Sequence, residues 1–367
     1  MIDTPSWYLI FFGAYNYFRN NGFFVYWTLV VLCVYQLYRF LRWSCCGDKP
    51  AKSIQGYRHM SQKVLQLYQE DFIDNHGRLA ADEIEVERFV DDELGLEMEL
   101  RFPKAKGSAG MFRMEKCRTA IVLTHPWSVL GGDMDNNVPE TLAKVFAHAG
   151  YVTCRFNFRG VGKSKGRCTW RTNGERRDLL NVVDFMLKED ARFSIKRVLL
   201  VGYSYGSIVS NASPRFRKEI IGFVSISCPF NVIWFLSMCN CYELWKGMQT
   251  HKPKLFICGT RDDFISPRSF LNYFDQFPQV HRHAVTVKDA NHGWFDKEVA
   301  VGGLILSWMR KQWEDDAVFQ AADLASGGTR KSSKGTSSIR ATSNVKQIPM
   351  DEEGGRDEVP EAVKKTQ

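Results

Sequence analysis

A short apolar strand that leads directly into a Gly-x-Ser-x-Gly turn places the strongest constraint on this chain. Residues 198–201 are Val-Leu-Leu-Val, Gly202-Tyr203-Ser204-Tyr205-Gly206 follows, and a helix-compatible stretch comes next. In such a strand–turn–helix, the glycines permit a turn too tight for side chains, and the serine hydroxyl is exposed at the carboxyl edge of the sheet. The amides at the start of the helix point to the same place, where an oxyanion would form. The pattern predicts that Ser204 is a nucleophile; the alternative is an ordinary strand-to-helix turn.

The hydrophobic pattern around this turn predicts strands that alternate with helices. Residues 84–90 and 96–102 alternate apolar and polar side chains, as antiparallel strands with one solvated face do. Residues 119–124 are continuously apolar, which is typical of a strand buried on both faces. We expect further strands near 151–157, 221–227, 254–259 and 283–288, and helices near 138–149, 172–190 and 297–313. This alternation predicts an α/β fold, with a mostly parallel sheet and helices on both faces.

A serine nucleophile needs a base, and the base needs a carboxylate that orients it. In this type of fold the chain order is serine, acid, histidine. His292 follows the last strand at its carboxyl end, where ligand crevices form, whereas the other histidines after Ser204 lie at the opposite sheet edge: His251, His281 and His283. Asp262 and Asp263 both follow the 254–259 strand, and we favour Asp262, although both could instead cap the helix that begins near Pro267. A triad of Ser204, Asp262 and His292 needs no cofactor and no metal.

The oxyanion hole of such a site needs two backbone amides. One is expected from Tyr205, the residue after the nucleophile, and the other from the loop after the 119–124 strand. That loop reads His-Pro-Trp-Ser from residue 125. Because proline has no amide hydrogen, Trp127 is the favoured donor and Ser128 the second choice.

Two longer motifs accompany these residues. Residues 131–136 read Gly-Gly-Asp-Met-Asp-Asn, and residues 155–166 read Arg-Phe-Asn-Phe-Arg-Gly-Val-Gly-Lys-Ser-Lys-Gly. With the serine turn and the His-Pro segment, they make residues 83–314 resemble the α/β-hydrolase superfamily, and more narrowly a small-lid branch familiar from bacteria. The resemblance implies a serine hydrolase with a minimal lid. The branch usually reads His-Pro-His-Pro at the oxyanion segment, so Trp127-Ser128 is a departure that changes the polarity of the pocket mouth.

The amino-terminal segment predicts a membrane anchor at residues 1–46. Residues 23–41 carry a single charge, Arg39, and about twenty apolar residues are long enough to span a bilayer, so we place a transmembrane helix at about 23–43. The alternative, a cleaved signal peptide, lacks a small-residue cleavage site. More basic residues follow this segment than precede it, which predicts a single-pass protein with the large carboxyl-terminal part in the cytosol, at the endoplasmic reticulum or another endomembrane. Cys45 and Cys46 are either juxtamembrane palmitoylation sites or unmodified cysteines.

Composition defines the rest of the domain organisation and excludes some partners. Residues 47–82 are polar and predict a linker, and the hydrolase domain should occupy 83–314. The tail at 315–367 is poor in aromatic residues and has no periodic apolar pattern, so it should be disordered. The formal charge of +8 is spread out without interleaved basic and aromatic residues, so we expect no nucleic-acid partner. The ten cysteines have no regular spacing, which predicts reduced thiols.

The segment between the strands ending near 227 and starting near 254 is too short for a large cap. It carries apolar residues that could form a lip over the site: Phe230, Ile233, Trp234, Phe235, Leu236, Met238 and Trp245. With Trp127 and the anchor, this lip favours an acyl ester or thioester of a lipid or lipidated protein, although such residues are also ordinary core. Two other readings stay open: a non-catalytic membrane-tethered scaffold whose tail binds protein partners, and a lipid acyltransferase that uses the same triad.

Overall fold

The computed structural model describes residues 54–75, 83–103, 118–169, 172–188, 194–236 and 242–314. The predicted anchor at 1–46, with its span at 23–43, and the predicted tail at 315–367 lie outside these ranges. Within them, no helix combines the length and the apolar character that crossing a bilayer requires.

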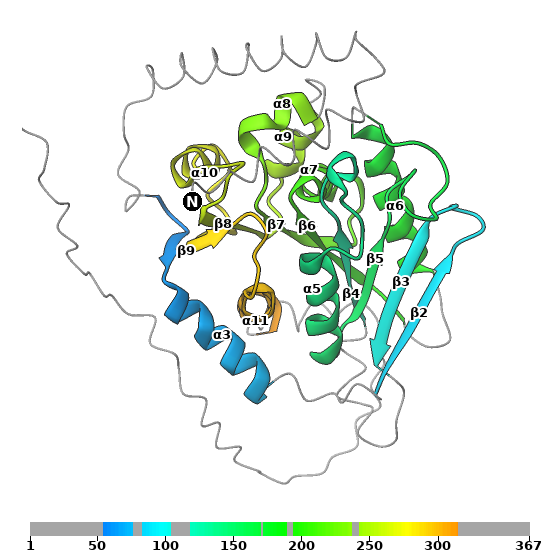
Figure 1. The fold of residues 1–367 in the computed structure, drawn as a ribbon, viewed down its shortest axis with the longest axis horizontal. Coiled ribbons are helices and arrows are strands. Elements are labelled where there is room, and N and C mark those ends of the chain that lie inside the picture. Colours follow the sequence, from blue (N-terminus) through cyan, green and yellow to red (C-terminus); the bar gives the residue numbers. More distant parts are fainter. Residues whose placement is uncertain are drawn as a thin grey trace, which may run out of the picture. The chain divides into compact units, whose positions relative to one another are not determined.

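The described strands form one mostly parallel sheet of nine strands, in the order β1-β9-β8-β7-β6-β4-β5-β3-β2. Only β2 with β3 and β3 with β5 pair antiparallel. Figure 1 shows this sheet at the centre of the fold, with β1 beside β9 at one edge and β2 at the other. The strands are β1 (Tyr57–Met60), β2 (Ile84–Val90), β3 (Glu97–Pro103), β4 (Thr119–Thr124), β5 (Val152–Phe156), β6 (Arg197–Tyr203), β7 (Ile220–Ile226), β8 (Lys254–Arg261) and β9 (Arg282–Asn291).

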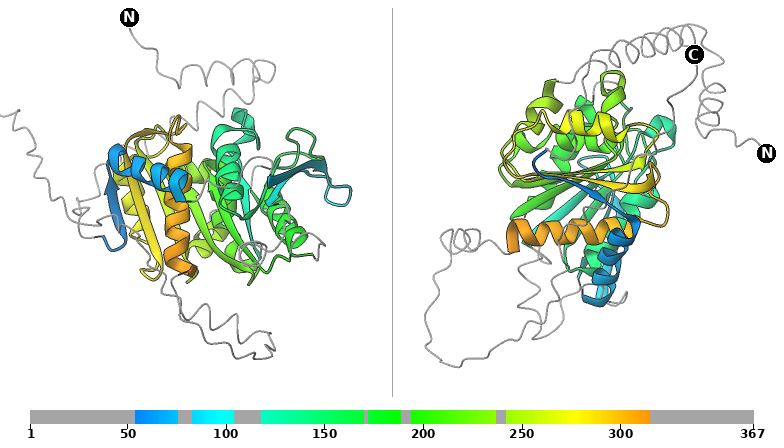
Figure 2. Two further views of the ribbon diagram at one scale, coloured as in Figure 1. Left: turned by 90° about the horizontal axis from the view of Figure 1, so that it is seen from below. Right: turned by 90° about the vertical axis from the view of Figure 1, so that its left-hand side faces the viewer.

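Helices cover both faces of the sheet, which confirms the predicted α/β fold. They are α3 (Gln62–Asn75), α5 (Asn137–His148), α6 (Asn173–Leu187), α7 (Tyr205–Asn211), α8 (Ile233–Leu236), α9 (Tyr242–Met248), α10 (Pro267–Phe274) and α11 (Glu298–Met309). Core residues of α3, α5 and α11 pack on one face, and those of α6, α7, α9 and α10 pack on the other. Figure 2 shows α3 and α11 side by side on their common face.

The continuously apolar β4 shows why the two faces need covering. Ala120 and Val122 belong to one core cluster, and Ile121 and Leu123 to the other, because successive side chains of a strand point to opposite faces. All four side chains are buried. The prediction of a strand buried on both faces is therefore confirmed.

The fold begins earlier in the chain than the sequence predicted. Residues 57–75 were expected to lie in a linker, but Tyr57–Met60 pairs parallel with β9, and α3 packs against α11. A side chain at Gly303 of α11 would place its Cβ 2.2 Å from the carbonyl oxygen of Tyr68, so the close approach of these helices requires glycine. The strand was not predicted because it is a short, polar edge strand in which only Met60 is buried.

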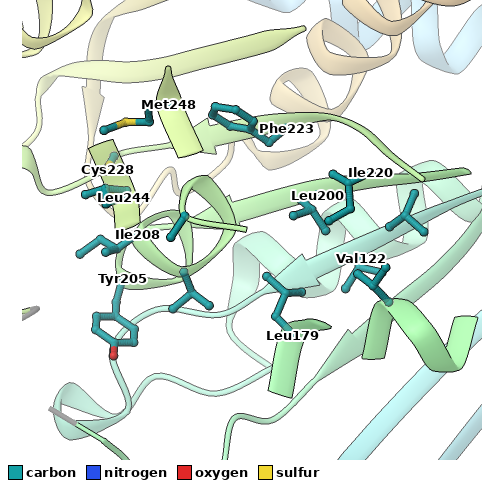
Figure 3. Packing of buried hydrophobic residues seen from close by; sticks show 14 of the residues in the cluster. Val122, Leu179, Leu200, Tyr205, Ile208, Ile220, Phe223, Cys228, Leu244 and Met248 are labelled. Carbon is teal, nitrogen blue, oxygen red and sulfur yellow. The ribbon is translucent and has the colours of Figure 1, made fainter. Parts of the chain in front are cut away.

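Apolar packing fixes α7, the helix that begins directly after Ser204. Figure 3 shows Tyr205 and Ile208 of α7 in the same buried cluster as Leu244 and Met248 of α9 and as Leu200 and Phe223 of the strands β6 and β7. Residues 131–136 lie between β4 and α5, and residues 155–166 run from the end of β5 into the loop that follows it. The packing therefore holds the end of β6 rigidly, which is where the candidate nucleophile lies.

Candidate active site

Ser204 lies in a strained turn between β6 and α7. Its φ is 53° and its ψ is −121°, a left-handed backbone conformation that a residue with a side chain rarely adopts. A Cβ at Gly202 would lie 2.5 Å from the Cα of Ser207, and one at Gly206 would lie 2.4 Å from the carbonyl oxygen of Thr124. Both glycines are therefore required sterically, and the turn has the geometry of a nucleophile elbow.

The structure brings the three residues of the predicted triad together. Ser204 follows β6, Asp262 follows β8, and His292 follows β9, all at the carboxyl edge of the sheet. Nε2 of His292 lies 2.9 Å from Oγ of Ser204, and Nδ1 lies 2.9 and 3.0 Å from the two carboxylate oxygens of Asp262. An ionised carboxylate only accepts hydrogen bonds, so Nδ1 carries the hydrogen and Nε2 accepts from the serine hydroxyl. This tautomer is the one that can remove a proton from Ser204.

The carboxylate of Asp262 is buried and held in a fixed orientation. Its side chain has no exposed surface, and its Oδ1 also accepts a hydrogen bond from the amide of Phe264 at 3.0 Å. Asp263, the other candidate, is exposed. The structure therefore places Asp262, and not its neighbour, against His292.

The loop that carries His292 is tied to the fold on several sides. The rings of Tyr203 and Phe264 lie with their centroids 5.6 and 4.5 Å from that of His292. The hydroxyl of Tyr203 donates to the carbonyl oxygen of His292 at 2.8 Å, and the side chain of Asn137 donates to the carbonyl oxygen of Gly293 at 2.7 Å. These contacts restrict the movement of the imidazole.

The remaining histidines named from the sequence lie away from the triad. His281 and His283 lie at the start of β9, and His251 lies shortly before the start of β8, so all three are at the amino edge of the sheet. His283 accepts a hydrogen bond at Nδ1 from the indole of Trp308 at 3.1 Å. None of the three contacts Ser204 in the hydrogen bonds of the described residues.

The two residues predicted to form the oxyanion hole lie beside each other. Trp127 follows β4 and Tyr205 begins α7, with their rings 6.5 Å apart. The carbonyl oxygen of Trp127 accepts hydrogen bonds from the amides of Leu130 and Gly132, which closes a tight turn. A Cβ at Gly132 would lie 2.3 Å from the carbonyl oxygen of Pro126, so this turn requires glycine. Donation by the Trp127 and Tyr205 amides stays a prediction, as does the choice of Trp127 over Ser128.

His125 fixes the start of this loop, a role that the sequence did not indicate. The residue is fully buried, its Nδ1 lies 2.7 Å from the carbonyl oxygen of Pro126, and its Nε2 accepts from the amide of Phe158 at 3.0 Å. Burial lowers the pKa of His125 to about 4, so the ring is neutral at pH 7 with its hydrogen on Nδ1. The histidine thus joins the candidate oxyanion loop to the loop after β5.

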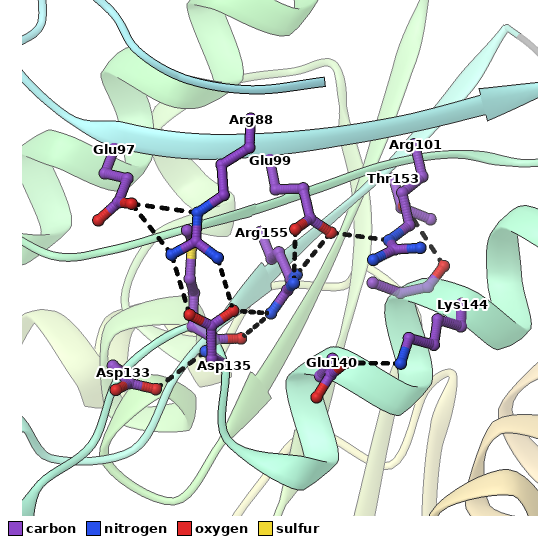
Figure 4. A network of polar contacts seen from close by, with 12 residues as sticks. Arg88, Glu97, Glu99, Arg101, Asp133, Asp135, Glu140, Lys144, Thr153 and Arg155 are labelled. Carbon is purple, nitrogen blue, oxygen red and sulfur yellow. Dashed lines mark hydrogen bonds and ion pairs between the residues drawn. The ribbon is translucent and has the colours of Figure 1, made fainter. Parts of the chain in front are cut away.

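Residues of the two longer motifs take part in a partly buried polar network with β2 and β3 (Figure 4). Arg155 of β5 pairs with both oxygens of Glu99 at 2.9 and 2.6 Å, and it also donates to the carbonyl oxygen of Met134 at 2.6 Å. Asn157 accepts from the amide of Met134 at 2.8 Å. Burial alone would raise the pKa of Glu99, but the hydrogen bonds and charges of the neighbouring arginines lower it. The motif residues thus position the 131–136 loop, and they do not contact the triad.

Comparison with known proteins gives the following similarities. The model of the X-Pro dipeptidyl-peptidase (S15) family matches residues 113–225, which include Ser204. An uncharacterized protein of Rickettsia prowazekii is 33% identical over 114 residues, a match that spans 31% of this chain and 46% of that protein.

This chain aligns with nearly the full length of several solved structures. An α/β serine hydrolase homologue from Coxiella burnetii is 26% identical, with a TM-score of 0.48, over 61% of this chain and 96% of its own. A lidless α/β serine hydrolase from Xanthomonas campestris is 20% identical, with a TM-score of 0.49, over 64% of this chain and 97% of its own. Est1E from Butyrivibrio proteoclasticus, solved with ferulic acid, is 17% identical, with a TM-score of 0.49, over 61% of this chain and 98% of its own.

The fold and site of this chain, together with the family match, define its class. The sheet is mostly parallel, the serine turn follows a central strand, and the acid and the histidine follow later strands in the order Ser, Asp, His. The chain therefore has an α/β-hydrolase fold and the triad arrangement of a serine hydrolase.

Proposed function

We propose that this protein cleaves a carboxylic ester or thioester through an acyl-enzyme on Ser204. The observation that carries the proposal is the continuous hydrogen-bonded chain from the buried carboxylate of Asp262 through His292 to the serine hydroxyl. A scaffold without activity has no need for a strained serine together with a base and an orienting acid.

In the first half of the reaction, Oγ of Ser204 attacks the acyl carbonyl carbon while its proton moves to Nε2 of His292. The carboxylate of Asp262 stabilises the imidazolium that forms. The amides of Trp127 and Tyr205 would donate to the tetrahedral oxyanion. When this intermediate collapses, the bond to the leaving group breaks, and the imidazolium returns the proton to the departing alcohol or thiol.

In the second half, water attacks the acyl-enzyme with His292 again as the base. The carboxylic acid leaves, and the serine regains its proton. An alcohol in place of water would give acyl transfer by the same steps, so an acyltransferase stays the alternative within this mechanism. The ratio of free acid to transesterified product, measured with glycerol present, separates the two.

Apolar residues at the site support an acyl substrate. Phe264 packs on the triad histidine, and exposed apolar side chains follow both site loops: Val129 and Leu130 are each 42% exposed just after Trp127, and Phe295 is 63% exposed. Of the residues expected to form the lip, Phe230, Ile233 and Leu236 are buried in the core. Among the described residues, the loops at 127–130 and 293–295 therefore carry exposed apolar side chains next to the site residues.

The match to the S15 family favours a second candidate function. That family is named for an X-Pro dipeptidyl-peptidase, and the match includes the candidate nucleophile. A peptidase of this type would use the same serine chemistry on an amide.

We also propose that residues 23–43 anchor the enzyme in an endomembrane with the hydrolase domain in the cytosol, next to lipid or lipidated protein substrates.

Labelling with a fluorophosphonate probe tests the catalytic proposal directly. The full chain should label, and the Ser204→Ala variant should not; equal labelling of both would exclude Ser204 as the nucleophile. Folding of the variant is checked by its circular dichroism spectrum. A scaffold without activity predicts no labelling of either chain.

Substrate class is then tested with matched chromogenic substrates. We expect hydrolysis of p-nitrophenyl butyrate and octanoate, with little release of p-nitroaniline from Ala-Pro-p-nitroanilide; the reverse preference would favour the peptidase. Ser204→Ala and His292→Ala should each lower kcat by roughly 10⁴-fold or more, and the double variant should be little worse than either alone. Additive losses would mean that the two residues do not act as one unit.

A further inference from the structure

A cavity lies at the sheet edge opposite the triad. It has a volume of about 580 Å³ and is lined where β1 and β9 begin, and by Gln312 just after α11. Figure 1 shows β1 and β9 adjacent at one end of the sheet. Because Ser204, Asp262 and His292 follow the carboxyl ends of their strands, this cavity is separate from the candidate active site.

The described residues that line the cavity are polar and positively charged. They include Arg58, His281, Arg282 and His283, together with Tyr57 and three glutamines, and no aspartate or glutamate is among them. The volume is within the range of small-molecule sites, but the lining lacks the apolar side chains that usually hold an uncharged organic ligand. The composition of the wall therefore indicates an anion.

Arg282 has donor capacity that the described residues do not use. The residue is 2% exposed, and its Nη1 donates to the carbonyl oxygens of Phe274 and Phe277 at 2.6 and 2.7 Å. Its Nε and Nη2 have no hydrogen-bond partner among the described residues. The nearest carboxylate oxygen, of Asp275, lies 3.7 Å from Nη2, which is an ion pair beyond hydrogen-bond distance. Buried guanidinium donors without acceptors are rare, because desolvation without a hydrogen bond is costly.

Burial and nearby positive charge lower the pKa of two basic side chains next to Arg282. Lys254 is fully buried, with Nζ bonded to the carbonyl oxygen of Thr250; burial and then the charge of Arg282 lower its pKa to about 8. Burial, followed by the charges of Arg58, His281 and Lys311, lowers the pKa of His283. Since the indole of Trp308 donates to Nδ1 of His283, the neutral ring carries its hydrogen on Nε2, as a further donor.

We propose that this cavity binds a phosphate group, carried either by a small phosphate ester or by a lipid headgroup. Arginine presents a planar fork of donors that matches phosphate oxygens, and two arginines and two histidines converge on this space. A cavity of about 580 Å³ is larger than one phosphate ion, so it also has room for the polar group esterified to it. The proposal does not depend on the reaction at Ser204.

The cavity is lined by a residue close in sequence to the predicted span, so a lipid headgroup is a reasonable ligand. Gln55, the second described residue, lines the cavity. The predicted span ends at residue 43, and segment 44–53 can extend over roughly 35 Å at most. In a chain anchored by that span, this tether would keep Gln55 within roughly 35–40 Å of the membrane, so a lipid headgroup could reach the cavity.

The test is isothermal titration calorimetry of the full chain in nanodiscs of phosphatidylcholine, with inorganic phosphate and with glycerol 3-phosphate at constant ionic strength. We expect saturable binding to one site. Arg58→Gln should weaken it about 10-fold or more, the effect of losing a charge-assisted hydrogen bond. Arg58 is exposed, so the variant should fold, whereas a change at buried Arg282 would confound binding with folding. Ester hydrolysis by Arg58→Gln should be unchanged.

The matched control is Arg177→Gln, which removes an exposed arginine of α6 outside this cavity. Absence of saturable binding to the unaltered chain would overturn the proposal, as would equal weakening by both variants. Nanodiscs that contain phosphatidic acid identify the source of the phosphate. If a headgroup occupies the cavity, these discs should suppress binding of added phosphate in the unaltered chain; if the ligand is a free ester, the affinity should be the same in both kinds of disc.

Discussion

Lowering the pH should destabilise this fold through one buried histidine. His125 is neutral in the folded protein because burial lowers its pKa to about 4, whereas the pKa of an unfolded histidine is about 6.5. Between these values the unfolded chain binds the proton more readily than the folded chain. The contribution of His125 to stability is therefore complete above about pH 6.5 and is lost as the pH falls towards 4.

The magnitude follows from the pKa difference. The difference between a pKa of about 6.5 in the unfolded chain and about 4 in the folded chain corresponds to about 3 kcal/mol. Domains of this kind are stable by only about 5–15 kcal/mol, so the loss is a large fraction of the total. Protonation also removes the acceptor at Nε2 that holds the amide of Phe158, which loosens the link between the candidate oxyanion loop and the loop after β5.

The assay is urea unfolding of the full chain between pH 7 and pH 4, followed by tryptophan fluorescence. The variant His125→Gln keeps an acceptor for the Phe158 amide but does not titrate. We expect it to be less stable than the natural chain at pH 7, because the ring contact with Phe158, at 4.4 Å between centroids, is lost. The difference in unfolding free energy between the two chains should shrink by about 3 kcal/mol on going to pH 4.

The matched control is His251→Gln, which removes an exposed histidine. Its unfolding free energy should follow that of the natural chain at every pH. A constant difference between the natural chain and His125→Gln from pH 7 to pH 4 would refute the reasoning, because it would mean that His125 titrates alike in both states.

Three further predictions concern the triad, the buried network and the anchor. Asp262→Asn should lower kcat by several orders of magnitude, since the amide cannot hold the required tautomer, whereas Asp263→Asn should change steady-state rates little; the opposite result would reassign the acid. Arg155→Met should lower the urea-unfolding free energy by about 3 kcal/mol or more by leaving Glu99 buried without its main partner, and adding Glu99→Leu should recover part of the loss; additive losses would exclude the coupling. Residues 23–43 should keep the protein in membranes during carbonate extraction, and protease should digest the domain in sealed microsomes without detergent; protection until detergent is added would place the domain in the lumen.

The architecture of this protein and the nature of its site could be inferred from local patterns. A nucleophile elbow is a contiguous segment whose glycines are required sterically, so Gly202-Tyr203-Ser204-Tyr205-Gly206 is recognisable without the rest of the fold. The carboxyl ends of parallel strands meet at one edge, and the chain order of the triad then narrows the acid to Asp262 or Asp263 and the base to His292. Strands such as β4 are equally recognisable from the sequence, because a strand that is buried on both faces requires a continuous run of apolar residues.

Other features were decided only by contacts between distant parts of the chain. Which aspartate faces His292 depends on the backbone just after β8, where the side chain of one is buried and its neighbour is exposed. β1 is a polar edge strand, so its sequence lacks an apolar signal, and only its pairing with β9 makes it part of the sheet. The role of His125 follows from its burial beside Phe158, which lies on another loop. In each case the residue's environment, and not its type, sets its function, and that environment exists only in the folded chain.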